Sequence, residues 1–543
     1  MKKKLLFTLI STLFIFTVSG CKRRIRLKNV PPTAESFNKI GRSLKNANLD
    51  FNDVTFKQKL ESFLEIIKDP NTTNDKIIDL VYEIFSNVME LNKKYYIADA
   101  LYNYDMNNNE YKAKRNVLSD AYYEYESFLA NITYELRDNR ETLKEILGII
   151  DDSDLDYEIE LAIKKKEDKY IELKKEIDEI SLEYDQLNFS INDSSKDDQI
   201  AEILFRFVNK NKELSEYLGF DSYIKYRDTE YKRTYNISDS SDFINNVKKY
   251  IIPKMDIDRN VIPLANKIFN LSYGEYNYLI EFDETSVFDS DYKTINLAKD
   301  YSKKVGGDYY KTFNNFLSNG NYIFSNNKSS LDSAYTNPYL CYFGANYQNV
   351  NTLIHEFGHY YSLSTGLASI KSLDMQEFYS QANEFLFMSY LEQNSFKNVL
   401  NVYDVLSCYK IDEACLTMLV GSSLREFEQE IYSKEISTLT DFKTIWNNLN
   451  QNEYNSLLSD YWKYEVRYDN YYLSYATSVT GALSLYSYSQ TNLNDAIEKY
   501  IMACKNLEMD DDLVETLKKI KLNDPFNEDT FKNIEVLIEE KRK

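Results

Sequence analysis

Glycine and proline are scarce in this chain, and their scarcity restricts the fold more than any other single feature. The 543 residues include only 13 glycines and 7 prolines. Sandwiches and barrels place both residue types at their many tight turns, whereas long helices joined by few corners need little of either. The count therefore predicts a mostly α fold, and the length leaves room for two or three sub-domains around a sizeable core.

The net charge excludes one large class of partner. Lys and Arg number 65 against 86 for Asp and Glu, which gives a formal charge of −21. Such a chain repels phosphate backbones, and no basic stripe along the sequence offsets that repulsion. We therefore expect no nucleic-acid partner.

The first twenty residues are typical of an export signal. Three lysines at positions 2–4 precede an apolar stretch, residues 5–18, that is short for a membrane span. The stretch ends in Val18-Ser19-Gly20-Cys21, which resembles the lipobox of bacterial lipoproteins. The resemblance implies that residues 1–20 are a signal peptide, that Cys21 is lipidated, and that the protein is lipid-anchored on the outer face of a membrane of the bacterial cell envelope. The alternative is an ordinary N-terminal membrane anchor with an accidental cysteine.

Helical periodicity dominates the rest of the chain. One stretch before residue 200 spaces its apolar residues three and four apart, which predicts a helical hairpin packed along a seam; it contains Tyr170, Leu173, Ile177, Ile180, Tyr184 and Leu187. Polar residues 192–198 then interrupt the pattern. They predict a boundary between an N-terminal helical domain, residues 21–200, and a second domain, residues 201–543. Strand-like sequence is confined to residues 270–345, including 276–280 and 339–343, so we expect a mostly α fold with one small β-sheet.

Both histidines of the chain lie in one motif, His355-Glu356-Phe357-Gly358-His359. Residues four apart on a helix share one face, so both imidazoles can bind a single metal ion. Glu356 then points to the open position of the metal, where it can take a proton from a water whose pKa zinc lowers to about 7. The motif predicts one Zn²⁺ per chain, with His355 and His359 as ligands and Glu356 as general base. Gly358 costs a helix about 1 kcal/mol relative to Ala, which indicates that something approaches the backbone there.

A zinc ion that keeps one position for water needs a third protein ligand. Glu377 and Glu384 lie seven residues apart on one face of a second predicted helix. One of them can bind the metal while the other orients a ligand through a hydrogen bond. Asp374 and Glu377 also have the spacing of a capping pair, so Glu377 has a structural alternative. The residues alone leave this choice open.

These segments resemble the thimet oligopeptidase and oligoendopeptidase F family of zinc peptidases. His-Glu-Phe-Gly-His is the form of the motif that this family favours, and residues 377–384 resemble its Glu-x-x-Ser-x-x-x-Glu segment. The resemblance implies that Glu377, the first Glu of that segment, is the third zinc ligand, and that Glu384 orients a ligand. The connection from His355 is several residues shorter than usual, and residue counting alone would favour Glu384.

A tyrosine-rich segment extends the resemblance, as do residues 218–226, which are similar to a segment upstream of the catalytic helix. In residues 468–477, Tyr468 and Tyr475 match two family tyrosines that donate hydrogen bonds to the substrate carbonyl as it becomes an oxyanion. The alternative is an aromatic stripe that belongs to the core, because the chain contains 48 tyrosines.

One family feature is absent. Family members usually carry a histidine shortly before these tyrosines, whereas this chain offers Lys463, Glu465 or Arg467. A cation can partly substitute as a hydrogen-bond donor. The departure also motivates an alternative function, a catalytically inactive lipid-anchored protein that binds peptides.

The resemblance implies two mostly helical halves that flank a deep substrate channel, with the small sheet near the zinc. The expected activity is a zinc-dependent endopeptidase that hydrolyses internal bonds of short unstructured peptides. A zinc carboxypeptidase that uses the same helix is the alternative enzyme. The expected partners are short peptides, and a membrane through the lipid anchor at Cys21.

Overall fold

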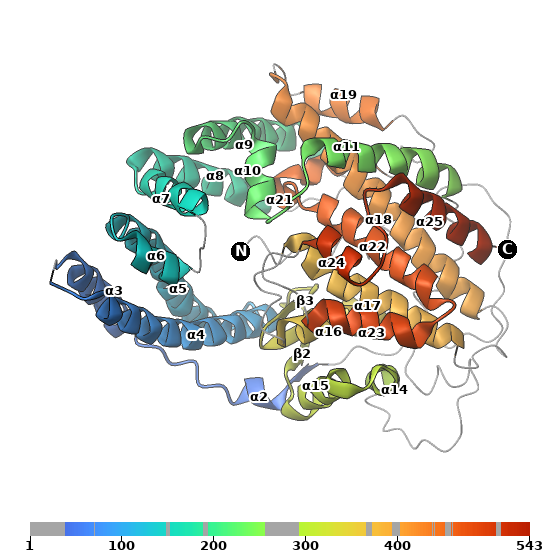
Figure 1. The fold of residues 1–543 in the computed structure, drawn as a ribbon, viewed down its shortest axis with the longest axis horizontal. Helices are drawn as coiled ribbons and strands as arrows, with labels where there is room; N and C mark the ends of the chain where they lie inside the picture. The colour runs from blue at the N-terminus through green and yellow to red at the C-terminus, as the bar shows by residue number, and fades with distance from the viewer. Residues whose placement is uncertain are drawn as a thin grey trace.

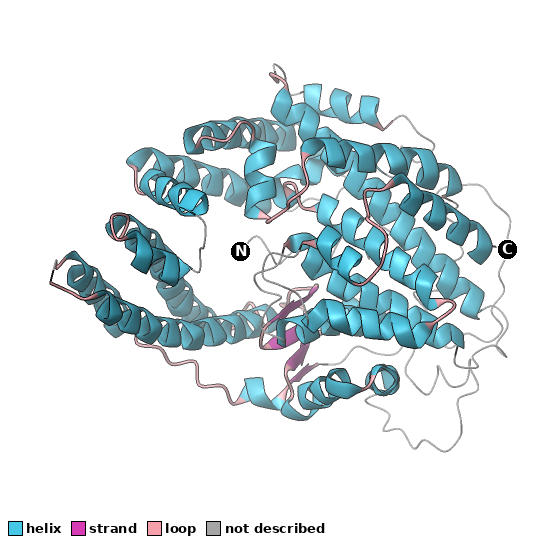
Figure 2. Cartoon of the chain, viewed as in Figure 1, coloured by secondary structure: helices cyan, strands magenta, loops and turns pink. Residues whose placement is uncertain are grey.

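The computed structural model describes residues 38–69, 71–147, 152–187, 194–255, 293–364, 372–393, 402–436, 438, 440–450, 458, 460–505 and 512–542. The expected signal peptide, Cys21 and the strand-like residues 276–280 lie outside them. Helices dominate the described chain (Figure 2). The principal helices are α2 (Arg42–Lys45), α3 (Asp53–Lys68), α4 (Asn74–Tyr104), α5 (Asn109–Glu135), α6 (Arg140–Leu147), α7 (Asp152–Lys165), α8 (Asp168–Gln186), α9 (Asp197–Leu218), α10 (Tyr223–Glu230), α11 (Ile237–Asn246), α14 (Lys293–Val305), α15 (Gly307–Asn319), α16 (Val350–Ser364), α17 (Leu373–Gln393), α18 (Val402–Ser433), α19 (Thr440–Leu449), α21 (Glu465–Tyr468), α22 (Tyr472–Ser489), α23 (Leu493–Lys505), α24 (Leu513–Lys519) and α25 (Glu528–Lys541).

Side-chain caps fix where several helices begin. The Asn52 side chain accepts a hydrogen bond from the Thr55 backbone N–H at 2.9 Å, ahead of α3. Asn236 and Asp239 form a reciprocal capping box at the start of α11. These side chains bond N–H groups that have no partner within the helix, so short polar residues determine where these helices start.

Four short strands form one sheet in the order β1-β2-β4-β3. β2 (Tyr322–Phe324) and β4 (Leu340–Phe343) are parallel, whereas β1 (Lys39–Ile40) and β3 (Ala334–Asn337) pair antiparallel at the two edges. The prediction that strands are confined to residues 270–345 was wrong for β1. A two-residue strand carries no period-two pattern, and it exists here only through its pairing with β2.

The sheet separates two hydrophobic cores. Successive residues of a strand point to opposite faces. Cys341 and Phe343 of β4 therefore join the larger core, while Leu340 and Tyr342 join the core of the N-terminal helices. Ile323 of β2 also belongs to the N-terminal core. Each face of the sheet is therefore buried against a different hydrophobic core.

Figure 1 shows the two helical bodies on the two sides of this sheet, α3 to α6 on one side and α16 to α25 on the other. The mostly α class with one small sheet is confirmed. α8 packs along α9, as expected for a helical hairpin packed along a seam. The connection between these two helices contains the predicted domain boundary near residue 200, and that boundary stays a prediction. Among the described helices, none combines the length and apolar composition that a membrane span requires.

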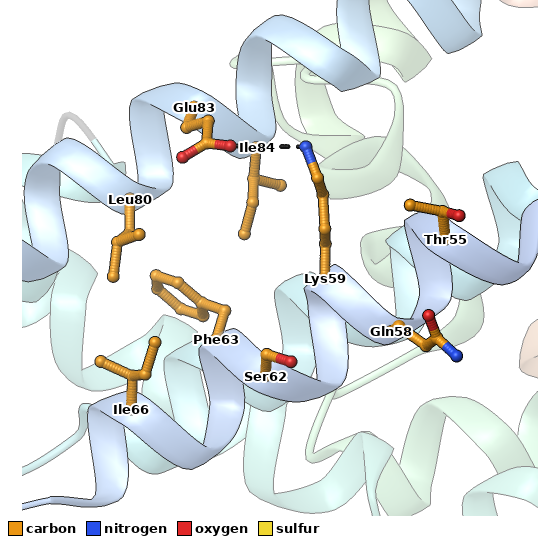
Figure 3. Close-up of a pocket in the computed structure, with 9 residues that line it drawn as sticks. All are labelled: Thr55, Gln58, Lys59, Ser62, Phe63, Ile66, Leu80, Glu83 and Ile84. Atoms are coloured by element: carbon orange, nitrogen blue, oxygen red, sulfur yellow. Dashed lines mark hydrogen bonds and ion pairs between the residues drawn. The ribbon is translucent and has the colours of Figure 1, made fainter. Parts of the chain in front are cut away.

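Cavities open at the N-terminal body between described residues. One, of about 260 Å³, lies between α3 and α4, where the Lys59 ammonium reaches Glu83 at 3.4 Å (Figure 3). Another measures about 870 Å³ and is lined by residues from both bodies, including Lys93 of α4, Tyr339 of the β3–β4 turn and Tyr360 of α16. The larger cavity therefore places open space beside the helix that carries both histidines.

Candidate metal centre

α16 carries the histidine motif as a buried helix. Phe357 on its apolar face meets an aromatic cluster, with ring centroids 5.0 Å from Tyr309 and 4.7 Å from Phe313. This packing fixes the rotation of the helix. Glu356 is 0% exposed and His355 5% exposed, so both polar side chains lie inside the protein. Burial of such groups is costly unless they are paired or bind a metal.

Gly358 allows α17 to approach α16 at backbone distance. A Cβ atom at this position would lie 2.7 Å from the Tyr379 carbonyl oxygen and 2.8 Å from Ser380 Cα. The approach expected from a glycine in mid-helix is therefore that of the second helix itself. It brings Glu377, one turn before Ser380, opposite the histidines.

His355, His359 and Glu377 form a compact group of candidate ligands. One ligand atom from each lies within 4.8 Å of the others, and no further such group of three is found in the part of the chain that is described. Glu377 Oε2 lies 4.0 Å from His355 Nε2 and 3.7 Å from His359 Nε2. Tetrahedral zinc with bonds of 2.0–2.1 Å separates its ligand atoms by about 3.4 Å. The three atoms are therefore close enough to converge on one ion, although the Glu377 oxygen lies further from both nitrogens than a bound ion would hold it. Glu377 Oε2 is buried and makes no hydrogen bond to any described residue, as expected of an atom directed at a metal.

The Glu384 carboxylate contacts Nδ1 of His355, the ring nitrogen that does not face Glu377. Its Oε1 is 2.5 Å from His355 Nδ1, while its Oε2 accepts hydrogen bonds from Asn351 at 2.7 Å and from Lys410. Burial alone would raise the pKa of Glu384, but Lys410 and His355 together lower it to about 2. An ionised Glu384 requires Nδ1 to carry the proton, which leaves Nε2 for the metal. Sequence reasoning missed Asn351 and Lys410, because neither lies in a motif.

The Glu356 side chain is hydrogen-bonded by a residue of strand β3. Thr336 of β3 donates a hydrogen bond from Oγ1 to Glu356 Oε2 at 2.7 Å, and Oε1 has no hydrogen-bond partner in the described structure. Burial raises the pKa of Glu356 to about 7, while His355 and the Thr336 hydroxyl lower it less strongly. A carboxyl group with a pKa near neutrality can both accept and release a proton. Thr336 was not predicted from sequence.

The tyrosine segment reaches the centre through Tyr471 as well as Tyr475. The Tyr471 hydroxyl donates a hydrogen bond to Glu377 Oε1 at 2.9 Å, and its ring lies 5.3 Å from that of Tyr475. Burial, followed by the nearby charge of Glu377, raises the pKa of Tyr475. Tyr468 ends α21, and its ring lies 5.4 Å from Tyr472. Sequence reasoning missed Tyr471, and the oxyanion roles of Tyr468 and Tyr475 stay predictions.

The residues near the absent family histidine have other partners. The Lys463 ammonium is buried and lies 2.6 Å from Asp197 Oδ1 and 2.9 Å from Asp460 Oδ1. Arg467 lies over the ring of Tyr184, with its guanidinium carbon 5.4 Å from the ring centroid. Lys463 is therefore held in an ion-pair cluster, and a cation that substitutes for the histidine stays a prediction.

The sequence matches no protein-family model and no curated protein. The fold, in contrast, resembles several solved structures. PZ peptidase A with an inhibitor superposes with a TM-score of 0.68 at 14% identity, over 92% of this chain and 99% of that chain. A protein from Bacillus anthracis str. Ames provisionally assigned as oligoendopeptidase F gives 0.66 at 16% identity, over 94% and 98%.

A third structure, of a provisionally assigned peptidase from Chlamydophila abortus, gives a TM-score of 0.60 at 15% identity. It covers 92% of this chain and 99% of that chain. At these identities the likeness establishes a shared fold over nearly the whole chain.

Proposed function

We propose that this protein is a zinc-dependent endopeptidase that hydrolyses internal bonds of short unstructured peptides. The observation that carries the proposal is the meeting of three candidate ligands, His355, His359 and Glu377, beside the buried Glu356 carboxyl. One nitrogen–nitrogen–oxygen ligand set and one proton acceptor are what metal-assisted hydrolysis of an amide requires. The fold shared with peptidases supports the same reaction class.

Each polar residue of the centre has a role in that reaction. Zinc, when bound, supplies Lewis-acid polarisation and acidifies water. Glu356 takes the proton of the attacking water on Oε1, the oxygen that Thr336 does not bond, and passes it to the leaving amine. Tyr475 and Tyr468 are the proposed donors to the oxyanion, while Tyr471 holds Glu377.

The edge strand β3 supports an extended peptide as the substrate. Among the described strands, β3 lies at the edge of the sheet and pairs with β4, and the hydroxyl of its Thr336 donates a hydrogen bond to the proposed general base, Glu356. A peptide added to this edge would place its backbone carbonyl groups beside Glu356, which is the geometry of strand addition. Folded proteins rarely offer an unpaired strand, so this mode favours unstructured peptides. The expected deep channel would also exclude folded proteins, and it stays a prediction.

Product analysis tests the proposal. A mixed peptide pool is incubated with the zinc-loaded protein and, in parallel, with Glu356→Gln, and the products are identified by mass spectrometry. Internal cuts made by the unmodified protein alone are the expected result. Release of single C-terminal residues would instead establish a carboxypeptidase. No cleavage despite bound zinc would identify a peptide-binding protein without activity.

We further propose that the protein is lipid-anchored at Cys21 on the outer face of a membrane of the bacterial cell envelope. The support is the sequence of residues 1–21 alone. Mass spectrometry of the N-terminal fragment from cells should find acylated Cys21 as the first residue. Cys21→Ser should transfer the protein from the detergent phase to the aqueous phase, and an unmodified fragment that retains residues 1–20 would refute the anchor.

A further inference from the structure

The turn that precedes Tyr471 is held by an unusual residue. Asn470 adopts a left-handed backbone with φ 58°, between the end of α21 and the start of α22. Non-glycine residues rarely adopt this conformation, although Asn tolerates it better than most. Glycine would adopt it without steric cost, so the side chain at position 470 calls for a physical explanation.

Every polar group of Asn470 is hydrogen-bonded in the interior of the protein. Its backbone N–H donates to Glu428 Oε1 at 2.9 Å, and its carbonyl oxygen accepts from Arg233 Nη2 at 2.7 Å. Its side-chain Oδ1 accepts from Arg425, and its Nδ2 donates to Asp228 Oδ1 at 3.3 Å. Four residues from three separate segments thus fix one turn.

The network behind this turn consists of buried charges. Asp228 Oδ1 lies 2.9 Å from Arg233 Nη1, and its Oδ2 lies 2.6 Å from Arg425 Nη2. Both arginine side chains are 0% exposed. Buried ion pairs of this kind add little net stability, because desolvation offsets most of their attraction. Their best-attested use is to specify one geometry among several.

The same network also reaches the helix that carries Glu377. Arg233 Nε lies 3.5 Å from Oδ1 of Asp374, in the first turn of α17 and one helical turn before Glu377. Arg233 Nη2 additionally donates to Ser474 Oγ at 2.7 Å, in the first turn of α22. One guanidinium therefore bridges the helix of the candidate ligand and the turn that precedes Tyr471.

We propose that Asn470 is a positioning residue of the metal centre, whose left-handed turn aims the Tyr471 hydroxyl at Glu377 Oε1. The hydroxyl engages one carboxylate oxygen at 2.9 Å and leaves Oε2 directed at the two histidines. The inference rests on the proposed function, because it assigns Glu377 to the metal. Residues that orient metal ligands typically change metal affinity about 10- to 100-fold when they are lost.

Zinc affinity, measured on the full chain by competition with a chromogenic chelator, tests the inference without reference to activity. Tyr471→Phe removes only the hydroxyl and should weaken zinc binding about 10-fold. Asn470→Gly keeps the left-handed backbone, loses the two side-chain bonds, and should weaken binding about 5-fold. In the Tyr471→Phe background, Asn470→Gly should add less than about 2-fold, because Asn470 acts through Tyr471.

The matched control is Lys521→Gly. Lys521 has the same left-handed backbone, with φ 57°, but it is exposed and lies in the connection between α24 and α25. Its replacement should leave zinc affinity unchanged. If Asn470→Gly does not fold, Arg425→Lys takes its place, because it keeps the buried charge and loses the planar fork that bonds Asn470.

Two results would overturn the inference while the wild-type protein still binds zinc. One is that Asn470→Gly binds zinc as tightly as the wild-type protein. The other is that the double variant loses zinc affinity by the product of the two single-variant losses, because Asn470 would then act independently of Tyr471. Absence of zinc binding by the wild-type protein would instead remove the proposed function, and with it this inference.

Discussion

Replacement of Gly358 by Ala tests whether close helix approach creates the metal centre. At an ordinary helix position, this change stabilises a protein by about 1 kcal/mol, because Ala has the higher helix propensity. Here the added Cβ would lie 2.7 Å from the Tyr379 carbonyl oxygen and 2.8 Å from Ser380 Cα. Both are backbone atoms of α17, so no side-chain rotation relieves the contact.

The size of the effect follows from these distances. Restoring a contact of 3.4 Å from 2.7 Å requires the helices to part by about 0.7 Å at this point. Overpacking of this kind costs about 1–3 kcal/mol, which exceeds the gain in propensity. Metal sites tolerate errors of about 0.2 Å in ligand distances, so the separation of Glu377 from the histidines should weaken zinc binding at least about 10-fold.

Gly481→Ala supplies a matched comparison within α22. A Cβ at Gly481 meets only side-chain atoms, Leu517 Cδ1 at 3.1 Å and the Phe378 ring at 3.4 Å. Both variants gain the same helix propensity, but only Gly358→Ala should lose stability in urea denaturation and zinc affinity in chelator competition. A Gly358→Ala protein that is about 1 kcal/mol more stable and binds zinc normally would refute the reasoning.

Three further results are expected. Thr336→Val removes the hydroxyl that lowers the pKa of Glu356, so the acid limb of kcat/KM against pH should move up by about 1 unit, whereas Thr336→Ser should keep the wild-type profile. Lys410→Met should lower the free energy of unfolding by about 3 kcal/mol at pH 7, because it removes the cation that compensates most of the burial of the Glu384 carboxylate and leaves it with the contacts to His355 and Asn351. Since the pKa of Glu384 is lowered to about 2, this loss should shrink as the pH falls from about 4.5 towards 2, and a pH-independent loss in denaturation curves would contradict the pairing. Without metal, burial raises the pKa of Glu356 and of Glu377 to about 7. Each group therefore contributes stability that is fully present below about pH 4.5 and is lost, by roughly 3 kcal/mol, as the pH rises from there to about 7. In chelator, Glu356→Gln should show a smaller loss over this range than the wild-type protein.

Local spacing was enough to predict the first part of the site. The four-residue separation of His355 and His359 requires only one helix, and helix geometry is independent of the rest of the chain. The cost of Gly358 in mid-helix also carried correct information, because a neighbouring backbone does occupy that space. The mostly α class followed in the same way from the few glycines and prolines.

Residues that act from a distance in the chain were not predictable in this way. Thr336 reaches Glu356 through sheet pairing, and Lys410 reaches Glu384 through the packing of α18. Neither contact leaves a period in the sequence. Tyr471 was missed because its direction depends on the left-handed turn at Asn470, which four distant side chains determine.

The two-faced sheet has a consequence for the order in which the chain can fold during synthesis. The N-terminal helices are made first, but their core also contains Ile323, Leu340 and Tyr342, and the partner of β1 in the described sheet is β2. Until residue 342 has been made, the earlier helices keep an apolar face that the strand residues do not yet bury. Closure of so long a loop is slow, and the open face attracts chaperones or other chains. A fragment that ends before residue 320 should therefore aggregate on expression, whereas one that extends past residue 343 contains the strands that close the N-terminal core.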